Sequence, residues 1–112
     1  MTTPEFNDII TAMINHCTET LIHKAKEYAT DDRLHNFKQA AHLQGITPMQ
    51  ALGGMMAKHT VSEYDMIASG ETYPLDLWEE KIGDGINYLL LLWAMVNEEA
   101  GVLPFTEDDL NE

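Results

Sequence analysis

Five polar or ionisable side chains interrupt a helical face whose other members are apolar: Lys58, His59, Ser62, Glu63 and Asp65. A buried charge is costly unless it is paired or bound to a metal ion. One interpretation is an internal ion-pair network, in which Lys58 or His59 meets an acid on another helix. The other is a reactive site, in which His59 acts as acid or base and Glu63 and Asp65 supply carboxylates.

A second acidic group follows on the next helical stretch, where Glu80 and Asp84 stand four residues apart. At this spacing both carboxylates project from the same side of a helix. Mg²⁺ prefers oxygen ligands and often bridges carboxylates and substrate phosphates. We therefore expect Mg²⁺ to be held by Glu80, Asp84 and Glu63. The alternative is a solvated helix face on which Lys81 pairs with a neighbouring acid.

Most of the few cations of this acidic chain gather before and within the second helical stretch. A lysine or arginine, together with free N–H groups at a helix start, can hold a phosphate, and an aromatic ring can stack on a base. The alternative is that the aromatic residues belong to the core and the cations balance nearby acids. The residues concerned are Lys24, Lys26, Tyr28, Arg33, Phe37, Lys38 and Lys58.

The stretch 75–100 must position the second acidic group. It follows Pro74 and precedes Gly101, which suit a helix start and a helix end. One line of apolar residues recurs at steps of three and four, and from Tyr88 to Val96 apolar residues cover every side. We expect this second half to be buried on all faces, inside the chain or against a second copy, and hence a homo-oligomer formed through residues 75–100. Glycines 83 and 85 indicate close packing at Asp84.

Three further helices are expected before it. The capping pattern Thr3-Pro4-Glu5 predicts a helix that continues to about Ala29, and a short helix should follow from about Arg33 to Gln44. Thr47-Pro48 predicts a third helix that ends at Ser69. The predicted fold is all-α: a four-helix bundle-like domain over residues 1–100, with two long helices at its ends and two shorter ones between. An acidic tail, 101–112, follows.

Composition narrows the classes of function. The chain has 112 residues and a formal net charge of −13, which makes direct nucleic-acid binding over a broad surface unfavourable. The charge fits a carboxylate metal site, a mimic of nucleic acid, or solubility alone. Cys17, the one cysteine, stands on an apolar helical face and is expected to be a core thiol. We expect no membrane association and a cytoplasmic protein, since no signal peptide or spanning segment is evident.

Four segments of the chain share one resemblance: Lys26-Glu-Tyr28, Arg33 to Lys38 with Asn36 and Phe37, Lys58-His59 with Asp65, and Glu80 to Asp84 with Asn87-Tyr88. Together they resemble small phage-encoded proteins of the nucleotide-modification-associated domain and, more distantly, the all-α nucleotide pyrophosphohydrolases of the MazG and dUTPase type. The similarity covers about Lys24 to Val96. MazG-like enzymes bind Mg²⁺ and a triphosphate with Glu-x-x-Glu and Glu-x-x-Asp pairs, and Asp84 matches the last acid. This chain has Lys81 where the family has a glutamate, and it has no Glu-x-x-Glu.

The resemblance implies a protein that binds a nucleotide or another phosphorylated small molecule between its helices. It extends the expected binding residues to Asn36, Asn87 and Tyr88, beside Lys26 and Lys58 as phosphate ligands. Mg²⁺-dependent hydrolysis of a pyrophosphate bond is one form of this function. The rival hypothesis is an acidic phage protein that inhibits a host defence protein or sequesters a nucleotide signal, and a third is a structural helical module.

Overall fold

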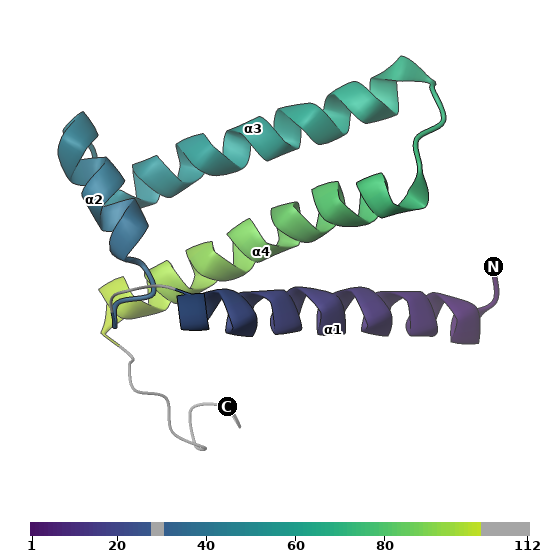
Figure 1. Cartoon of the computed structure of the whole chain (residues 1–112), viewed down its shortest axis with the longest axis horizontal. Helices are drawn as coiled ribbons and strands as arrows, with labels where there is room; N and C mark the ends of the chain where they lie inside the picture. The colour runs from purple at the N-terminus through teal and green to yellow at the C-terminus, as the bar shows by residue number, and fades with distance from the viewer. Residues whose placement is uncertain (28–30, 102–112) are drawn as a thin grey trace.

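The computed structural model describes residues 1–27 and 31–101, and these residues form helices and no strand. The predicted all-α, bundle-like fold is therefore confirmed (Figure 1). The tail after Gly101 lies outside the described residues, as do Tyr28 and the side chain of Lys26. The helices are α1 (Thr3–Glu27), α2 (His35–Gln44), α3 (Pro48–Ser69) and α4 (Leu75–Ala100).

Side-chain caps are present at the starts of α1 and α3, and the predicted cap of α1 needs one correction. At α3 the predicted cap is present: the Thr47 hydroxyl accepts from the Gln50 N–H at 3.1 Å, and the Gln50 side chain accepts from the Thr47 N–H at 3.0 Å. At α1 the same reciprocal pair joins Thr2 and Glu5. The capping residue is therefore Thr2, not the predicted Thr3, because Glu5 then stands at the third helical position that a capping box requires.

The second helix begins two residues later than predicted, at His35. A carboxylate oxygen of Asp32 accepts a hydrogen bond from the Leu34 N–H at 2.9 Å, which holds the preceding residues in a turn. Helices α2, α3 and α4 each end at a glycine with φ near +70°, a conformation that glycine adopts without the strain of a Cβ. The predicted ends at Gln44, Ser69 and Ala100 are confirmed.

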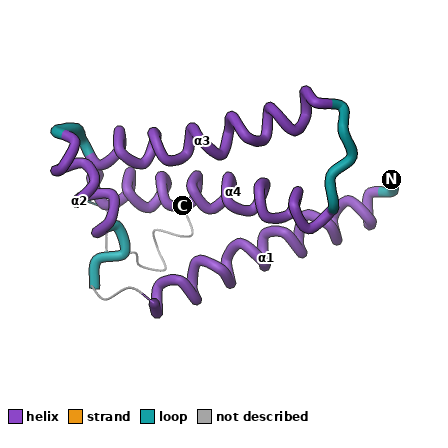
Figure 2. The backbone as a smooth tube through the Cα atoms, turned by 45° about the horizontal axis from the view of Figure 1, so that its top comes forward, coloured by secondary structure: helices purple, strands orange, loops and turns teal. Residues whose placement is uncertain are grey.

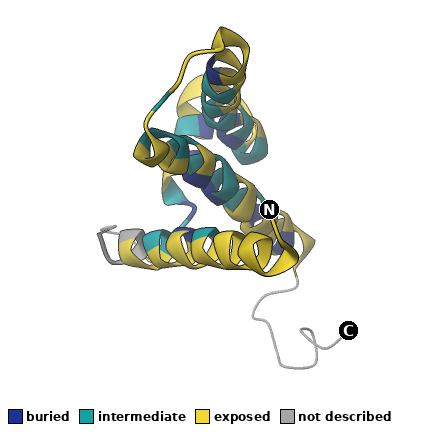
Figure 3. Cartoon of the chain, turned by 90° about the vertical axis from the view of Figure 1, so that its right-hand side faces the viewer, coloured by how far each residue is buried: buried dark blue, intermediate teal, exposed yellow. Residues whose placement is uncertain are grey.

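The long helices lie side by side, with α4 between α3 and α1, and α2 packs across the start of α3 (Figures 1 and 2). The core sits where α2, α3 and α4 meet. It is a cluster of four buried side chains, Leu34, Phe37, Leu52 and Met95, with partly buried apolar residues around it. Helix α1 lies on the other side of α4 and is exposed over most of its surface (Figure 3).

Much of the apolar surface of this chain stays outside the core. Among the described residues, eight apolar residues are buried, whereas seventeen large apolar residues are exposed. The stretch Tyr88–Val96 was expected to be covered on all faces, but Leu89 is 57% and Trp93 is 64% exposed. The chain itself therefore does not supply that cover, because α3 and α1 occupy only two sides of α4. No helix in the described part of the chain is long and apolar enough to span a bilayer.

Leucine-to-alanine changes at two positions should separate core from surface. Leu52 is fully buried, whereas Leu43 at the end of α2 is 84% exposed. Leu52→Ala should lower the free energy of unfolding by about 2–5 kcal/mol, since it leaves a cavity in the cluster. Leu43→Ala should change it by less than about 0.5 kcal/mol. Urea denaturation of both variants checks this, and equal losses would contradict the placement of the core.

Candidate functional site

A pocket of about 310 Å³ lies among all four helices, beside the core. Six of the residues that line it were predicted from the sequence as site residues. Leu21 and Leu91 also line it; they were missed because an apolar residue on a helical face carries no signal that separates pocket from core. The lining residues are Leu21, Arg33, Phe37, His59, Asp84, Asn87, Tyr88 and Leu91.

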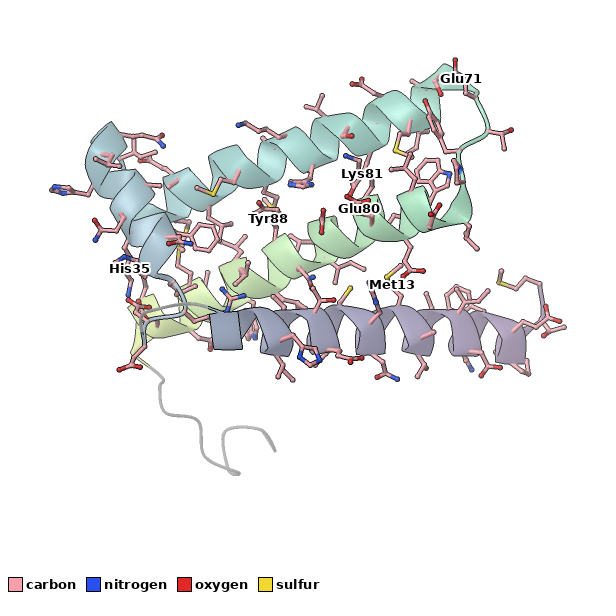
Figure 4. The ribbon with its side chains drawn as sticks, in the orientation of Figure 1. Met13, His35, Glu71, Glu80, Lys81 and Tyr88 are labelled. Atoms are coloured by element: carbon pink, nitrogen blue, oxygen red, sulfur yellow. The ribbon has the colours of Figure 1, made fainter. Side chains whose placement is uncertain are left out.

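Helix α4 supplies half of this lining. Asp84, Asn87, Tyr88 and Leu91 recur at steps of three, one and three, so they share one side of the helix. His59 comes from the facing side of α3, and Tyr88 lies between α3 and α4 (Figure 4). The pocket is therefore fixed by the packing of regular helices, which hold side chains more rigidly than loops do.

His59 contacts two other residues that line the pocket, Tyr88 and Asp84. Its ring packs against the Tyr88 ring, with centroids 4.9 Å apart and planes inclined by 41°. Its Nδ1 is 3.8 Å from Oδ2 of Asp84, which brings opposite charges together when the ring is protonated but is too long for a hydrogen bond. His59 thus meets an acid on another helix, as the ion-pair interpretation expected, but the contact is a loose one.

Two polar atoms of the site are buried and have no hydrogen-bond partner among the described residues: Nδ1 of His59 and Oδ1 of Asn87. Asn87 as a whole is 9% exposed. Leaving a buried donor or acceptor unpaired costs about 1–3 kcal/mol, so such atoms in a folded protein usually have water or a ligand as partner. The pocket is therefore equipped to form polar contacts that the described residues leave unmade.

The two glycines that flank Asp84 differ. A Cβ at Gly85 would lie 2.7 Å from Oε1 of Glu63, so the close approach expected from the sequence is confirmed there, and its partner is the Glu63 side chain. A Cβ at Gly83 would meet Cys17, His16 and Met13 only at ordinary contact distances of 3.8–4.0 Å. A close neighbour therefore accounts for the absence of a side chain at position 85, but not at position 83.

A smaller acidic cleft of about 240 Å³ lies where α1 meets α4. His16, Asp76, Glu79 and Glu80 line it, and Nε2 of His16 is 3.5 Å from Oε1 of Glu79. Asp84 and Asn87 line both this cleft and the larger pocket. The two hollows therefore share a wall on α4.

The three predicted metal ligands are not gathered into one site in this structure. Glu80 is exposed, Glu63 lies against Gly85, and Asp84 lies beside His59. Within residues 1–27 and 31–101 no three His, Cys, Asp or Glu side chains are arranged to hold a metal ion. Binding of Mg²⁺ stays a prediction from the sequence, and the function proposed below contains no metal step.

Other predicted site residues lie away from the pocket. Asn36, Lys58 and Asp65 are exposed and do not line it. Lys58 and Asp65 had been grouped with the site because they interrupt the same predicted helical face as His59, and Asn36 because of the family resemblance, but the structure leaves all three outside the lining. Of the predicted catalytic residues, only His59 reaches the pocket.

Lys38 was grouped with the phosphate-binding cations, but it has a structural role. Its ammonium group contacts Asp32 at 2.7 Å and Glu98 at 2.8 Å. The hydrogen bond from Lys38 lowers the pKa of Asp32, and the bonds to Asp32 and Glu98 raise the pKa of Lys38. This link joins the start of α2 to the end of α4, and Lys38 is not among the described residues that line the pocket, whereas Arg33 is.

Cys17 is a core thiol, as predicted. It is fully buried, and its Sγ donates to the carbonyl oxygen of Gly83 at 3.7 Å. Burial, and secondly the negative charge of Asp84, raise the pKa of the Cys17 thiol. Because the thiolate is the reactive form, this raised pKa disfavours a role as nucleophile.

The comparisons with known proteins are negative: no family model, no curated protein and no solved structure matches this chain.

Gly83→Ala should stabilise the protein by about 1 kcal/mol, since alanine is favoured over glycine inside a helix and its methyl group finds ordinary contacts on α1. Gly54→Ala is the matched control, because nothing lies within 4 Å of a Cβ there. It should show the same gain from helix propensity alone. The measurement is chemical denaturation, and a loss of stability in Gly83→Ala alone would mean that α1 lies closer to α4 than described.

Proposed function

We propose that this protein binds a small nucleotide, or a closely related phosphorylated molecule, in the pocket of Arg33, His59, Asp84, Asn87 and Tyr88. The observation that carries the proposal is a pocket that brings together a cation, an aromatic ring and the polar side chains of His59 and Asn87, each with a buried atom that lacks a hydrogen bond within the described part of the chain. In a hydrophobic core without a binding role, buried polar atoms normally have hydrogen-bond partners.

The polar atoms match the edge of a nucleobase. Oδ1 of Asn87 and the carboxylate of Asp84 are acceptors, and Nδ1 of His59 is a donor or an acceptor according to the tautomer. The N–H groups of a base can donate to these acceptors. Loss of such a contact leaves the protein atom unpaired, so a site of this kind selects strongly for a ligand that can form it.

The remaining lining suits the rest of a nucleotide. The Tyr88 ring can stack on a base, a contact worth about 1–3 kcal/mol. Phe37 is buried in the core and contributes little free surface, so we assign the stacking to Tyr88. Arg33 supplies charge and planar hydrogen-bond donors to phosphate oxygens.

Size and charge favour a ligand with few phosphates. A volume of about 310 Å³ is at the lower end of the range of small-molecule pockets, roughly 300–1,000 Å³. Arg33 is the cation among the described residues of the lining, the acid Asp84 lines the same pocket, and the chain as a whole has a formal charge of −13. We therefore expect a mononucleotide to bind more tightly than a dinucleotide or a triphosphate without a counter-ion.

Hydrolysis is a separate hypothesis, which needs the predicted Mg²⁺ ligands to come together.

The rival function, mimicry of nucleic acid against a host defence protein, would be supported by acids clustered on one outer surface. The described exposed acids lie on α1, α3 and α4 and in the segments between helices, and Asp76, Glu79 and Glu80 of α4 line the acidic cleft, so mimicry stays the alternative.

Titration calorimetry with the common ribo- and deoxyribonucleoside monophosphates tests the proposal. At least one should bind with a dissociation constant in the micromolar range. Arg33→Gln should weaken that binding at least tenfold, because it removes the charge that meets the phosphate. The matched control is Lys58→Gln, which removes an exposed cation outside the pocket and should bind like the parent.

Circular dichroism should show the parent helix content in both variants. No binding of any nucleotide to the folded parent protein would refute the proposal. An equal loss in Arg33→Gln and Lys58→Gln would do so too, since it would reduce the interaction to general charge attraction.

A further inference from the structure

The apolar line of α4 lies on the open side of that helix. Its members recur at steps of three and four over the whole length of α4, and none carries a charge. Leu75 is 82% exposed, and Ile82, Leu89, Trp93 and Val96 are exposed as well. The line, called the α4 stripe below, consists of Leu75, Trp78, Ile82, Ile86, Leu89, Trp93 and Val96.

The α4 stripe faces away from the pocket. Residues two apart in a helix point in directions roughly 200° apart. Ile82 is therefore nearly opposite Asp84, and Trp93 is nearly opposite Leu91, both of which line the pocket. A partner on the stripe would leave the pocket open.

The stripe continues onto α1 through an apolar groove of about 420 Å³. Leu75, Trp78 and Ile82 form one wall, and Ile9 and Met13 of α1 form the other. Figure 4 shows Met13 between the two helices. The groove opens because the first half of α1, which carries the exposed Phe6, Ile9 and Ile10, has little cover.

The spacing of the stripe fits a second copy of the same helix. If α4 is paired antiparallel with a copy of itself about a two-fold axis between residues 85 and 86, residue n faces residue 171 − n. Leu75 then faces Val96, Trp78 faces Trp93, and Ile82 faces Leu89, while Ile86 lies next to the axis. Such a self-complementary surface is what a two-fold symmetric dimer requires.

We propose that two copies of this chain pair through their α4 stripes in this antiparallel register, with the α1 walls of the two grooves completing the interface. The stripe is about 32 Å long and roughly 10 Å wide, so its projected area is only about 300 Å². A stable interface buries roughly 800 Å² on each partner. The groove on α1 must therefore take part in the contact.

Charge distinguishes a second copy from a basic partner. Two chains with a formal charge of −13 repel each other, so added salt should strengthen their association by screening. Binding to a basic protein would be weakened by salt instead. The uncharged stripe is the part of α4 on which two such chains can approach most closely.

Sedimentation equilibrium at 10–100 µM, at low and high salt, tests the proposal. The parent protein should have about twice the chain mass of 12.6 kDa, and the dimer should tighten with salt. Leu89→Glu should halve the measured mass. Val61→Glu is the matched control, because Val61 on α3 is 58% exposed against 57% for Leu89, and it should leave the dimer intact. A monomeric parent, or an unchanged mass in Leu89→Glu, would overturn the proposal.

Cysteine cross-linking tests the register without destabilising substitutions. In the antiparallel register Ile82→Cys and Leu89→Cys should form a disulfide only when the two variants are mixed, because each position faces the other. The fully buried Cys17 serves as the internal control, since the parent should not cross-link. Cross-linking of each variant with itself would indicate a parallel pair and would contradict the register.

Discussion

The packing of Leu34, Phe37, Leu52 and Met95 is the constraint on which the rest of this structure depends. These four side chains come from the turn before α2 and from three helices, so their burial brings otherwise separate segments together at one end of the molecule. Phe37 belongs both to this cluster and to the wall of the pocket. The pocket geometry is therefore a consequence of the core, and the Lys38 link to Glu98 ties the same end together at the surface.

Helix α4 carries three different surfaces around one axis. One packs on α3, a second packs on α1 and lines the pocket, and the third is the exposed α4 stripe. The second half of α4 has apolar residues on all sides, a pattern typical of a buried helix, and this chain covers only part of it. Ligand binding and self-association are thus assigned to opposite sides of a single helix, which allows both at once.

The sequence predicted the helices well because their signals are local. The capping pair at Thr47 and the glycines after α2, α3 and α4 act within a few residues, so the helix ends could be assigned.

Part of the site was also predictable: His59 stands out on an apolar line, and Asp84, Asn87 and Tyr88 share a side of α4. Lys58 and Asp65 do not line this pocket, because the interruption of an apolar line does not show toward which neighbour a charged side chain points. The cover of α4 could not be predicted, since periodicity shows that a face is apolar but not what packs on it.

The proposed nucleotide binding depends on the pocket that Asn87 and His59 line. An NMR titration of the ¹⁵N-labelled protein with nucleoside monophosphates tests this binding most directly. The largest amide shifts should occur at Arg33, His59, Asn87 and Tyr88, with little change at Ile9 and Ile10 in the first half of α1. Saturable shifts at the pocket are the predicted result. Shifts confined to α1, or no saturable shifts at all, would contradict the account.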